Sequence, residues 1–366
     1  MKLKNNFPVG VTLLTTLFLW GCSSGKKEVP DTQWALLPFA KVDSVNPVLF
    51  PGDNIFRCPI IDQNIKWENK DVFNPAAVVK DNKVFLVYRA EDTIGRFNGT
   101  SRLGLAVSED GFHFIKEPAP VFYPDNDSMK IYEWEGGVED PRIVENDAGQ
   151  YVLAYTAYDG TTARLCLAVS DDLHRWKKLG TVLQGKYKDH WSKSGAIVAR
   201  REGSRIIAQK INHRYWMYFG DSNLFMAWSN DLIHWTPILE NDDLKPVLTP
   251  RPGKFDSRLV ESGPYALMTQ KGILLIYNGM NLDTGGDPSL VAGAYCGGQA
   301  LFDLNDPTRL IDRMEEYFIK PEKPYETEGQ VNQVCFLEGM VYFKDRWLLY
   351  YGTADSKIAV AVSTPH

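Results

Sequence analysis

Short apolar runs separated by polar turns recur along most of the chain. In residues 76–90, for example, AAVV and VFLVYRA flank a KDNK turn. Similar pairs of runs occupy residues 141–158, 196–220, 263–279 and 334–352, with Gly, Asn or Asp between the halves. Runs bounded in this way are typical of β-hairpins. The pattern predicts an all-β fold without a long amphipathic helix.

One motif follows the hairpins three times. It reads LGLAVSEDGFHF at 103–114, LCLAVSDDLHRW at 165–176 and LFMAWSNDLIHW at 224–235: an apolar strand, a Ser, an acidic turn and an aromatic residue. The last hairpin is followed by a similar strand, KIAVAVS. Five units of roughly fifty to seventy residues predict a five-bladed β-propeller. A β-sandwich is the alternative, but it would not explain a repeat of that length.

The leading end of the first strand in each unit carries polar residues. In a propeller these ends face the axial funnel, where ligands bind. Their polar residues are Asn74, Glu139 and Asp140, Lys193, Glu261, and Asn332. A buried, unpaired charge costs several kcal/mol, so a purely structural ring would be apolar or small here. A solvated turn explains one such corner but not five, and the pattern favours a polar site.

Composition narrows the function classes. Lys and Arg total 40 against 46 Asp and Glu, and they are scattered, which argues against a nucleic-acid partner. The ten Trp and seventeen Tyr suit either a strand-rich core or a sugar-binding cleft. Cys58, Cys166, Cys296 and Cys335 show no metal-ligand spacing, so we expect neither a metal nor another cofactor. The last three lie in apolar runs and are expected to be buried free thiols.

The N-terminus has the pattern of a targeting segment. A basic start, MKLKNN, precedes an apolar run too short to span a bilayer, and LWGC ends it at Cys22. This resembles a bacterial lipoprotein signal, in which Cys22 carries the lipid; an uncleaved anchor helix is the alternative. We therefore expect a signal peptide over 1–22, a tether over 23–45 and the catalytic domain over 46–366. The expected location is the bacterial cell envelope, attached to the membrane and facing the periplasm or the cell surface.

Several segments together resemble glycoside hydrolase family 130, the mannoside phosphorylases and β-mannosidases. They are NPAAVVKDNKVFLVYRAEDT, LGLAVSEDGFHF, GGVEDPRI, SNDLIHW and LLYYGTADSKIAVAVS. The resemblance runs from about residue 74 to 363 and implies a five-bladed propeller. The EDPRI corner and the YYGTADSKIAVA ending are its more specific parts.

The resemblance implies an inverting cleavage of mannosides. Asp140 would be the proton donor, acting through a sugar hydroxyl. A mannose-containing oligosaccharide would be the substrate, and its ring would be held by Asn74, Arg89, Asp92, Arg102, Glu139, Arg142, Lys193, Asn278 and Asp355. Tyr132, Trp134 and Trp191 are candidates either for a sugar platform or for packing.

The nucleophile is the open question. Phosphorylases of the family carry basic residues in segments like HRP and YHG, whereas this chain has Gly220 and Asp221 in YFGDSN and Asn278 in IYNG. A phosphate dianion needs cations or clustered N–H donors, whereas an attacking water needs a carboxylate to accept its proton. We therefore predict an exo-acting β-mannosidase with Glu261 as general base and Asp221 as its assistant or alternate, with β-1,2 bonds as one candidate linkage.

Two alternatives remain open. A mannosyl phosphorylase would release α-mannose 1-phosphate, with an anion site built from Lys193, Arg200, Arg201, His213 and Arg214. A glycan-binding lipoprotein without catalysis would keep the ring-holding residues but have an inactive base. An assay on mannobioses with and without phosphate distinguishes the three.

Overall fold

The computed structural model describes residues 33–97 and 99–363. They belong to one compact unit, and residues 1–32, 98 and 364–366, among them the predicted signal peptide and Cys22, lie outside the described residues. The described chain is nearly all β, as predicted. Its helices are α1 (Lys130–Glu133), α2 (Pro324–Thr327) and the 3-10 turn Gly185–Tyr187. Within the described ranges, none of them is both long and apolar enough to cross a membrane.

Consecutive strands pair in antiparallel groups. The first group contains β4 (Asp71–Lys80), β5 (Lys83–Glu91), β6 (Ser101–Ser108) and β7 (Ile115–Lys116). The second contains β8 (Gly137–Glu145), β9 (Tyr151–Tyr158), β10 (Ala163–Ser170) and β11 (Lys177–Thr181). The third contains β12 (Ala196–Glu202), β13 (Arg205–Ala208), β14 (Tyr215–Phe219), β15 (Phe225–Ser229) and β16 (Trp235–Pro237).

The later strands continue the same arrangement. The next group contains β19 (Leu259–Ser262), β20 (Ala266–Met268), β21 (Ile273–Met280), β22 (Tyr295–Phe302) and β23 (Leu310–Arg313). The last contains β24 (Cys335–Phe343), β25 (Arg346–Thr353), β26 (Lys357–Ser363) and β1 (Ala40–Lys41). Two small hairpins are β2 (Ile55–Cys58) with β3 (Gln63–Lys66), and β17 (Leu239–Glu240) with β18 (Asp243–Leu244).

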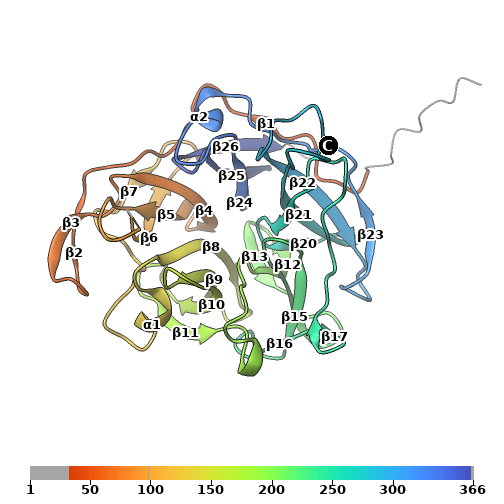
Figure 1. The fold of residues 1–366 in the computed structure, drawn as a ribbon, viewed down its shortest axis with the longest axis horizontal. Coiled ribbons are helices and arrows are strands. Elements are labelled where there is room, and N and C mark those ends of the chain that lie inside the picture. The colour runs from red at the N-terminus through yellow and green to blue at the C-terminus, as the bar shows by residue number, and fades with distance from the viewer. Residues whose placement is uncertain (1–32, 98, 364–366) are drawn as a thin grey trace, which may run out of the picture. The chain divides into compact units, whose positions relative to one another are not determined.

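The groups follow one another around a common centre, with β4, β8, β12 and β24 on the inner side (Figure 1). Parallel bridges join neighbouring groups, from β6 to β8 at Ser101↔Gly137 and from β12 to β20 at Val198↔Ala266. The leading ends of the inner strands therefore meet on one face of this unit.

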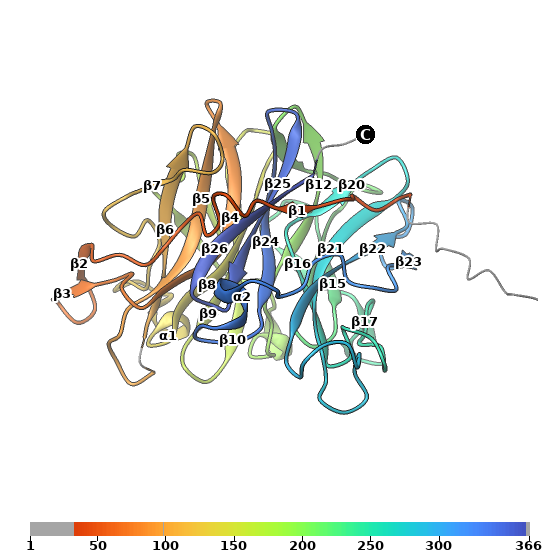
Figure 2. The same ribbon diagram turned by 90° about the horizontal axis from the view of Figure 1, so that it is seen from above.

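The first described strand completes the last sheet. Ala40 pairs with Val362 and Lys41 with Ala361, so β1 runs beside β26 (Figures 1 and 2). The Asn46 side chain also bonds both backbone groups of Val360, at 2.8 Å each. The fold thus begins before residue 46, and the expected boundary there is too late.

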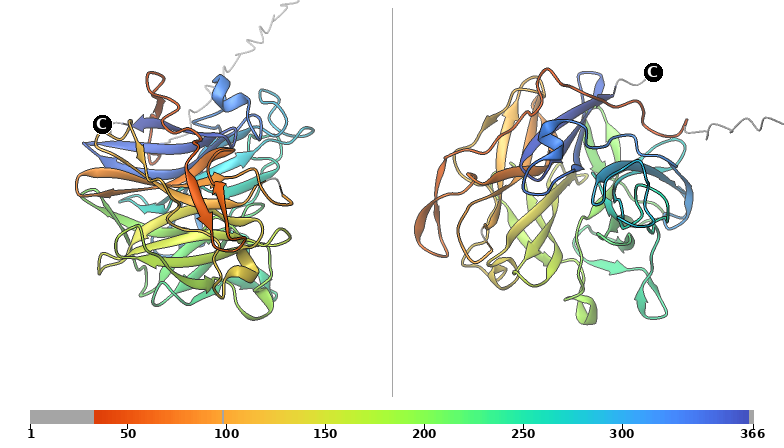
Figure 3. Two further views of the ribbon diagram at one scale, coloured as in Figure 1. Left: turned by 90° about the vertical axis from the view of Figure 1, so that its left-hand side faces the viewer. Right: turned by 45° about the horizontal axis from the view of Figure 1, so that its top comes forward.

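Large apolar side chains fill the space between neighbouring groups. β24, β25 and β26 lie beside β4 and β5 (Figure 3), and Trp67, Tyr88 and Tyr350 are fully buried in the cluster that includes them. Both β4 and β8 are buried along almost their whole length, and the burial includes the polar residues Asn74, Glu139 and Asp140. All four cysteines of the described chain are free and buried, as expected for Cys166, Cys296 and Cys335.

The repeated motif forms a turn after β6, β10 and β15. In the first copy, Asp110 Oδ1 accepts hydrogen bonds from the backbone N–H groups of Phe112 and His113, at 2.8 and 2.9 Å. The Ser108 hydroxyl accepts the Gly111 N–H at 2.8 Å. The other copies use Ser170 with Asp172 and Ser229 with Asp231 in the same way. The repeat therefore records a structural turn and not a ligand site.

Candidate active site

A cavity of about 290 Å³ opens where the leading ends of the inner strands meet. Six residues predicted from the sequence line it: Asn74, Arg89, Asp140, Lys193, Glu261 and Asp355. They come from β4, β5, β8, the segment before β12, β19 and the turn after β25. The structure brings these six together, and their functional roles stay predictions. Asn332 instead is exposed and bonds the Gly329 backbone N–H at 3.2 Å.

Irregular backbone turns these side chains into the cavity. The pairing of β4 with β5 shifts register between Phe73 and Pro75, and that of β8 with β9 shifts between Glu139 and Arg142. Asn74 and Asp140 occupy these shifts with φ of 45° and 49°. Asn and Asp tolerate such left-handed conformations better than other side chains, and a bulge redirects the residue that it holds. The local sequence thus suits the position.

Asp140 lies at the centre of a charged network. Its Oδ1 accepts hydrogen bonds from Asn74 Nδ2 and Arg89 Nη1, both at 3.0 Å, and its Oδ2 lies 3.2 Å from Lys193 Nζ. Although burial opposes ionisation, Lys193 and Arg89 hold the pKa of Asp140 well below its usual range. With these partners Asp140 is therefore an ionised carboxylate, which carries no proton to donate.

Other carboxylates already pair with the two cations. Arg89 Nη2 lies 3.0 Å from Glu139 Oε1 and 2.8 Å from Glu91 Oε1, and Lys193 Nζ lies 3.6 Å from Glu139 Oε2. Burial raises the pKa of Glu139, and Arg89 and Lys193 oppose this. Glu139 does not line the cavity, but it pairs with Arg89 and Lys193, the two cations that do.

Two neighbouring residues hold Glu261 in place in the cavity. It lies in β19, where it pairs with Asn278 of β21, and one of its oxygens accepts a hydrogen bond from the Ser194 hydroxyl. Burial raises the pKa of Glu261 to about 7, and the charge of Asp221 adds to the effect. Asp221 lies outside the lining and accepts a 2.7 Å hydrogen bond from the Trp191 indole. The two carboxylates proposed as base and assistant are thus electrostatically coupled.

Asp355 is a second carboxyl group whose pKa is raised to a value similar to that of Glu261. Burial raises its pKa to about 7, while the Arg89 guanidinium works in the opposite direction. Near neutral pH the cavity therefore contains one carboxyl that is ionised, Asp140, and two that exchange protons, Glu261 and Asp355. Acid–base catalysis requires carboxyl groups whose pKa values differ in this way.

Two predicted ring-holding residues instead bind each other. Arg102 Nη1 lies 2.6 Å from Asp92 Oδ2, and both side chains are almost fully buried. Asp92 Oδ1 also accepts the backbone N–H groups of Ile94 and Thr100, each at 3.0 Å. Neither residue lines the cavity, so this pair braces the loop between β5 and β6.

Arg142 and Asn278 tie inner strands together. Arg142 donates to the carbonyls of Ser262 and Gly263, each at 2.7 Å. Asn278 is fully buried, and its amide bonds both the N–H and the carbonyl of Leu337, at 2.8 and 3.0 Å. Asn278 thus makes a structural link to Leu337 and does not line the cavity, and its predicted contact with substrate stays a prediction. Arg142 also lies outside the lining and supports the backbone around the site.

Except for Lys193, the cations considered for a phosphate site lie outside the cavity lining. Arg200 pairs with Glu202 at 2.7 Å, the Arg201 guanidinium lies 4.0 Å from the centre of the Tyr342 ring, and that of Arg214 lies 3.9 Å from the centre of the Trp228 ring. The anion site suggested from sequence is therefore not assembled from these residues.

Sequence reasoning missed two polar lining residues. Arg258 is an exposed cation at the cavity edge, and Tyr295 begins β22. Arg258 immediately precedes β19, so its place at a leading end could have identified it. Tyr295 belongs to a later strand of its group, and no pattern in the sequence pointed to it.

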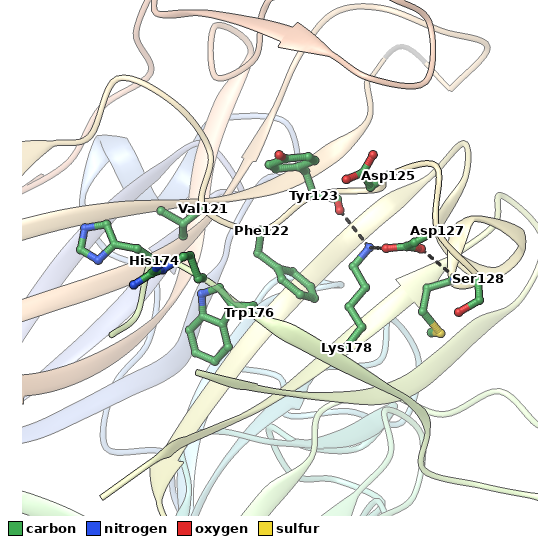
Figure 4. A pocket seen from close by; sticks show the side chains of 11 residues that line it. Val121, Phe122, Tyr123, Asp125, Asp127, Ser128, His174, Trp176 and Lys178 are labelled. Carbon is green, nitrogen blue, oxygen red and sulfur yellow. Dashed lines mark hydrogen bonds and ion pairs between the residues drawn. The ribbon is translucent and has the colours of Figure 1, made fainter. Parts of the chain in front are cut away.

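A second cavity, of about 410 Å³, lies at the flank of the first two groups. Figure 4 shows Lys178 between Asp127 and the Tyr123 carbonyl, with Phe122 and Trp176 nearby. The Lys178 ammonium lies 3.0 Å from each of those two partners. This cavity has no cluster of inner-strand residues. Within the described residues, no group of three or more His, Cys, Asp or Glu is placed to hold a metal ion.

Comparison with known proteins identifies similar chains. The family model described as beta-1,4-mannooligosaccharide phosphorylase matches residues 53–365. The 1,2-beta-oligomannan phosphorylase of Thermoanaerobacter sp. (strain X514) is 33% identical, and the match covers 81% of this chain and 91% of the relative. A glycosyl hydrolase structure from Bacteroides ovatus is 48% identical with a TM-score of 0.88, covering 91% and 95% of the two chains.

A further similar structure is described in the words "The GH130 family of mannoside phosphorylases contains glycoside hydrolases that target beta-1,2 mannosidic linkages in Candida mannan". It is 45% identical to this chain with a TM-score of 0.89, and the match covers 92% of this chain and 96% of the other.

Proposed function

The chain belongs to glycoside hydrolase family 130, and from this premise we propose that it cleaves β-mannosides with inversion, using water as the nucleophile. The β-1,2 linkage is proposed because similar proteins carry it in their descriptions. The substrate would be a mannooligosaccharide whose terminal ring enters the cavity.

The charge around Glu261 is the observation that carries the choice of water. Glu261 lines the cavity and has the charge of Asp221 behind it, while Lys193 and Arg89 are already paired with Asp140. A phosphate dianion entering beside Glu261 would be repelled by these carboxylates. A water molecule there would instead find an acceptor for its proton, which inverting hydrolysis requires.

Phosphorolysis is the second candidate, and the named relatives favour it over hydrolysis. Two curated relatives at 33% and 31% identity are phosphorylases that act on β-1,2-mannosides. Arg258 adds a structural reason, because it is an exposed cation at the edge of the cavity. Together with Lys193 it offers two positive charges to an incoming phosphate.

In the proposed mechanism Asp140 supplies the proton and Glu261 takes one from water. Asp140 is ionised in the empty site, so it must gain a proton when the sugar binds. A sugar hydroxyl that replaces Lys193 or Arg89 as its partner would raise the pKa of Asp140, because opposite charge is what holds it low. Asn74, Arg89, Lys193 and Asp355 would hold the ring.

Proton NMR of β-1,2-mannobiose cleavage, with and without phosphate, tests the proposal. Hydrolysis predicts free mannose, formed first as the α-anomer, at a rate that phosphate changes little. Accumulation of α-mannose 1-phosphate, with no cleavage when phosphate is omitted, would establish phosphorolysis instead. In that case Arg258→Gln should raise the KM for phosphate. Binding of the sugar without cleavage under either condition would indicate a glycan-binding protein.

We also propose that the antiparallel groups are the five blades of a β-propeller. The support is their consecutive order, their arrangement around one centre and the β1 strand that completes the last sheet. A crystal structure of the chain should show the blades closed around an axial cavity lined by Asp140 and Glu261.

The membrane anchor remains a proposal based on the sequence around Cys22. If LWGC is a lipoprotein signal, Cys22→Ala should move the protein from the membrane to the soluble fraction of the cell. Unchanged membrane association of this variant, with an intact N-terminal segment, would contradict the proposal.

A further inference from the structure

Three aromatic side chains form a continuous strip, defined here as Phe97, Tyr158 and Trp191. The ring centroids of Phe97 and Tyr158 lie 6.2 Å apart, and those of Tyr158 and Trp191 lie 6.3 Å apart. Phe97 is 36% exposed and Trp191 46% exposed, which is unusual for large apolar side chains in contact with one another. Phe97 lies in the connection between β5 and β6, Tyr158 ends β9, and Trp191 lies in the connection before β12, so the strip depends on the tertiary fold.

The strip lies at the leading end of β8, next to the candidate active site. Tyr158 pairs with Gly137, the first residue of the strand that carries Asp140. A Cβ atom on Gly136 would lie 2.3 Å from the Tyr158 ring, and one on Gly160 would lie 2.1 Å from the Phe97 ring. Glycine at both positions therefore makes room for the rings. The first Gly of GGVEDPRI thus makes room for the strip, the second lies against the Ser101 backbone, and the Asp lines the cavity.

One end of the strip contacts Asp221, which lies outside the cavity lining but acts electrostatically on Glu261. The Trp191 indole donates a 2.7 Å hydrogen bond to Asp221, whose charge acts on Glu261. At the other end, the Arg96 guanidinium lies 4.5 Å from the centre of the Phe97 ring and presents N–H donors beside it. The strip thus runs outward from the base and combines flat apolar rings with a cation.

We propose that this strip binds the sugar units that extend beyond the bond to be cleaved, which makes oligosaccharides longer than a disaccharide the preferred substrates. A cavity of about 290 Å³ is small for a ligand site and leaves the rest of an oligosaccharide outside. Aromatic rings supply contact area to the apolar face of a sugar, and Arg96 can bond its hydroxyls. The inference rests on the proposed cleavage of mannosides and specifies the length of the substrate.

The test compares kcat/KM for β-1,2-mannotetraose with that for β-1,2-mannobiose. The wild-type ratio should exceed one, and Phe97→Ala should lower it about three- to tenfold, the range expected for the loss of one ring contact. Phe97→Tyr keeps the ring and should restore the ratio. Phe50→Ala is the matched control, because Phe50 is 50% exposed but is not part of the strip.

A ratio unchanged in Phe97→Ala, or a wild-type ratio of one, would overturn the strip proposal while leaving mannoside cleavage intact. If the wild-type protein cleaves neither sugar, the proposed function fails, and the same comparison is made with dissociation constants from calorimetry. Tighter binding of the tetraose that Phe97→Ala abolishes would still support the strip, and equal binding of both sugars would overturn it.

Discussion

At the scale of single residues, the environment of Glu261 determines when it can act as a base. Its pKa of about 7 results mainly from burial, and the hydrogen bond from the Ser194 hydroxyl favours the ionised form. A base works only when ionised, so the rate should rise as the pH increases through about 7. In this site pH dependence therefore reports directly on one side chain.

Ser194→Ala should move this rising limb to higher pH. The change removes a donor to the Glu261 carboxylate, which raises its pKa further, and the measurement is kcat/KM against pH. Asp355→Asn is the control, because Asp355 has a similar pKa of about 7 but is not the proposed base, so the limb should remain. Glu261→Gln should remove the limb together with most of the activity. An unshifted limb in Ser194→Ala would assign the titration to another group.

Asp140→Asn should lower the turnover of an unactivated mannoside at least about 10²-fold, the usual contribution of a general acid. The amide keeps the shape and the hydrogen bond to Asn74 but has no transferable proton. Release of free mannose from the natural disaccharide is the measurement, and circular dichroism checks the fold. Near-normal turnover would show that another group donates the proton.

Much of the candidate site could be predicted from the polar residues at the leading ends of the strands. Asn74, Asp140, Lys193 and Glu261 were predictable because each is polar at a position where an inner strand should be apolar. By contrast, Asp92 with Arg102 and the buried Asn278 use their polar groups inside the protein. The side-chain partners depend on tertiary contacts that a single sequence does not reveal.

At the scale of elements, Asn278 connects β21 to β24. Its amide satisfies both backbone groups of Leu337, a residue beside the register shift between Leu337 and Gly339 in β24. Strands in neighbouring groups share few backbone hydrogen bonds. The Asn278 side chain therefore makes the hydrogen bonds to Leu337 that a neighbouring strand would otherwise make. The sequence predicted the two hairpins that contain these strands but not the link between them.

Asn278→Ala should lower the free energy of unfolding by about 2–4 kcal/mol, since each buried backbone group left unpaired costs about 1–3 kcal/mol. Urea denaturation followed by tryptophan fluorescence measures the change. Asn332→Ala is the control, because its exposed side chain accepts one 3.2 Å hydrogen bond from the Gly329 N–H, and it should cost less than about 0.5 kcal/mol. Unchanged stability with a raised KM would restore the substrate role predicted from sequence.

At the scale of the whole described unit, closure depends on the segment that precedes β2. β1 pairs with β26, and Asn46 continues that attachment through Val360. The hydrophobic pattern did not reveal this, because a strand of two residues has no recognisable period. The repeats, in contrast, gave the order of the larger sheets, since each repeats the same hairpin and turn chemistry.

Asn46→Ala should destabilise the fold by about 1–3 kcal/mol, because it leaves the Val360 N–H without its Asn46 acceptor, while the Val360 carbonyl keeps only the 3.2 Å hydrogen bond from the Val42 N–H. Hydrogen exchange should show the loss of protection concentrated in β26. Asn126→Ala removes only exposed hydrogen bonds, one to the Pro59 carbonyl and one from Lys130 Nζ, and is the matched control. Equal loss of protection in all strands would indicate that the closure is not a local attachment.

The pairing of β1 with β26 also means that the backbone order around the sheets is nearly circular. The connection between β12 and β13 is a turn of Gly203 and Ser204, in which Gly203 is exposed, and it is remote from β1 in the sequence. A circular permutant that joins the two natural ends through a flexible linker and opens the chain at this turn would keep every described strand pairing. It would place a covalent bond where the native protein relies on hydrogen bonds, and so convert a seam held by noncovalent contacts into continuous backbone.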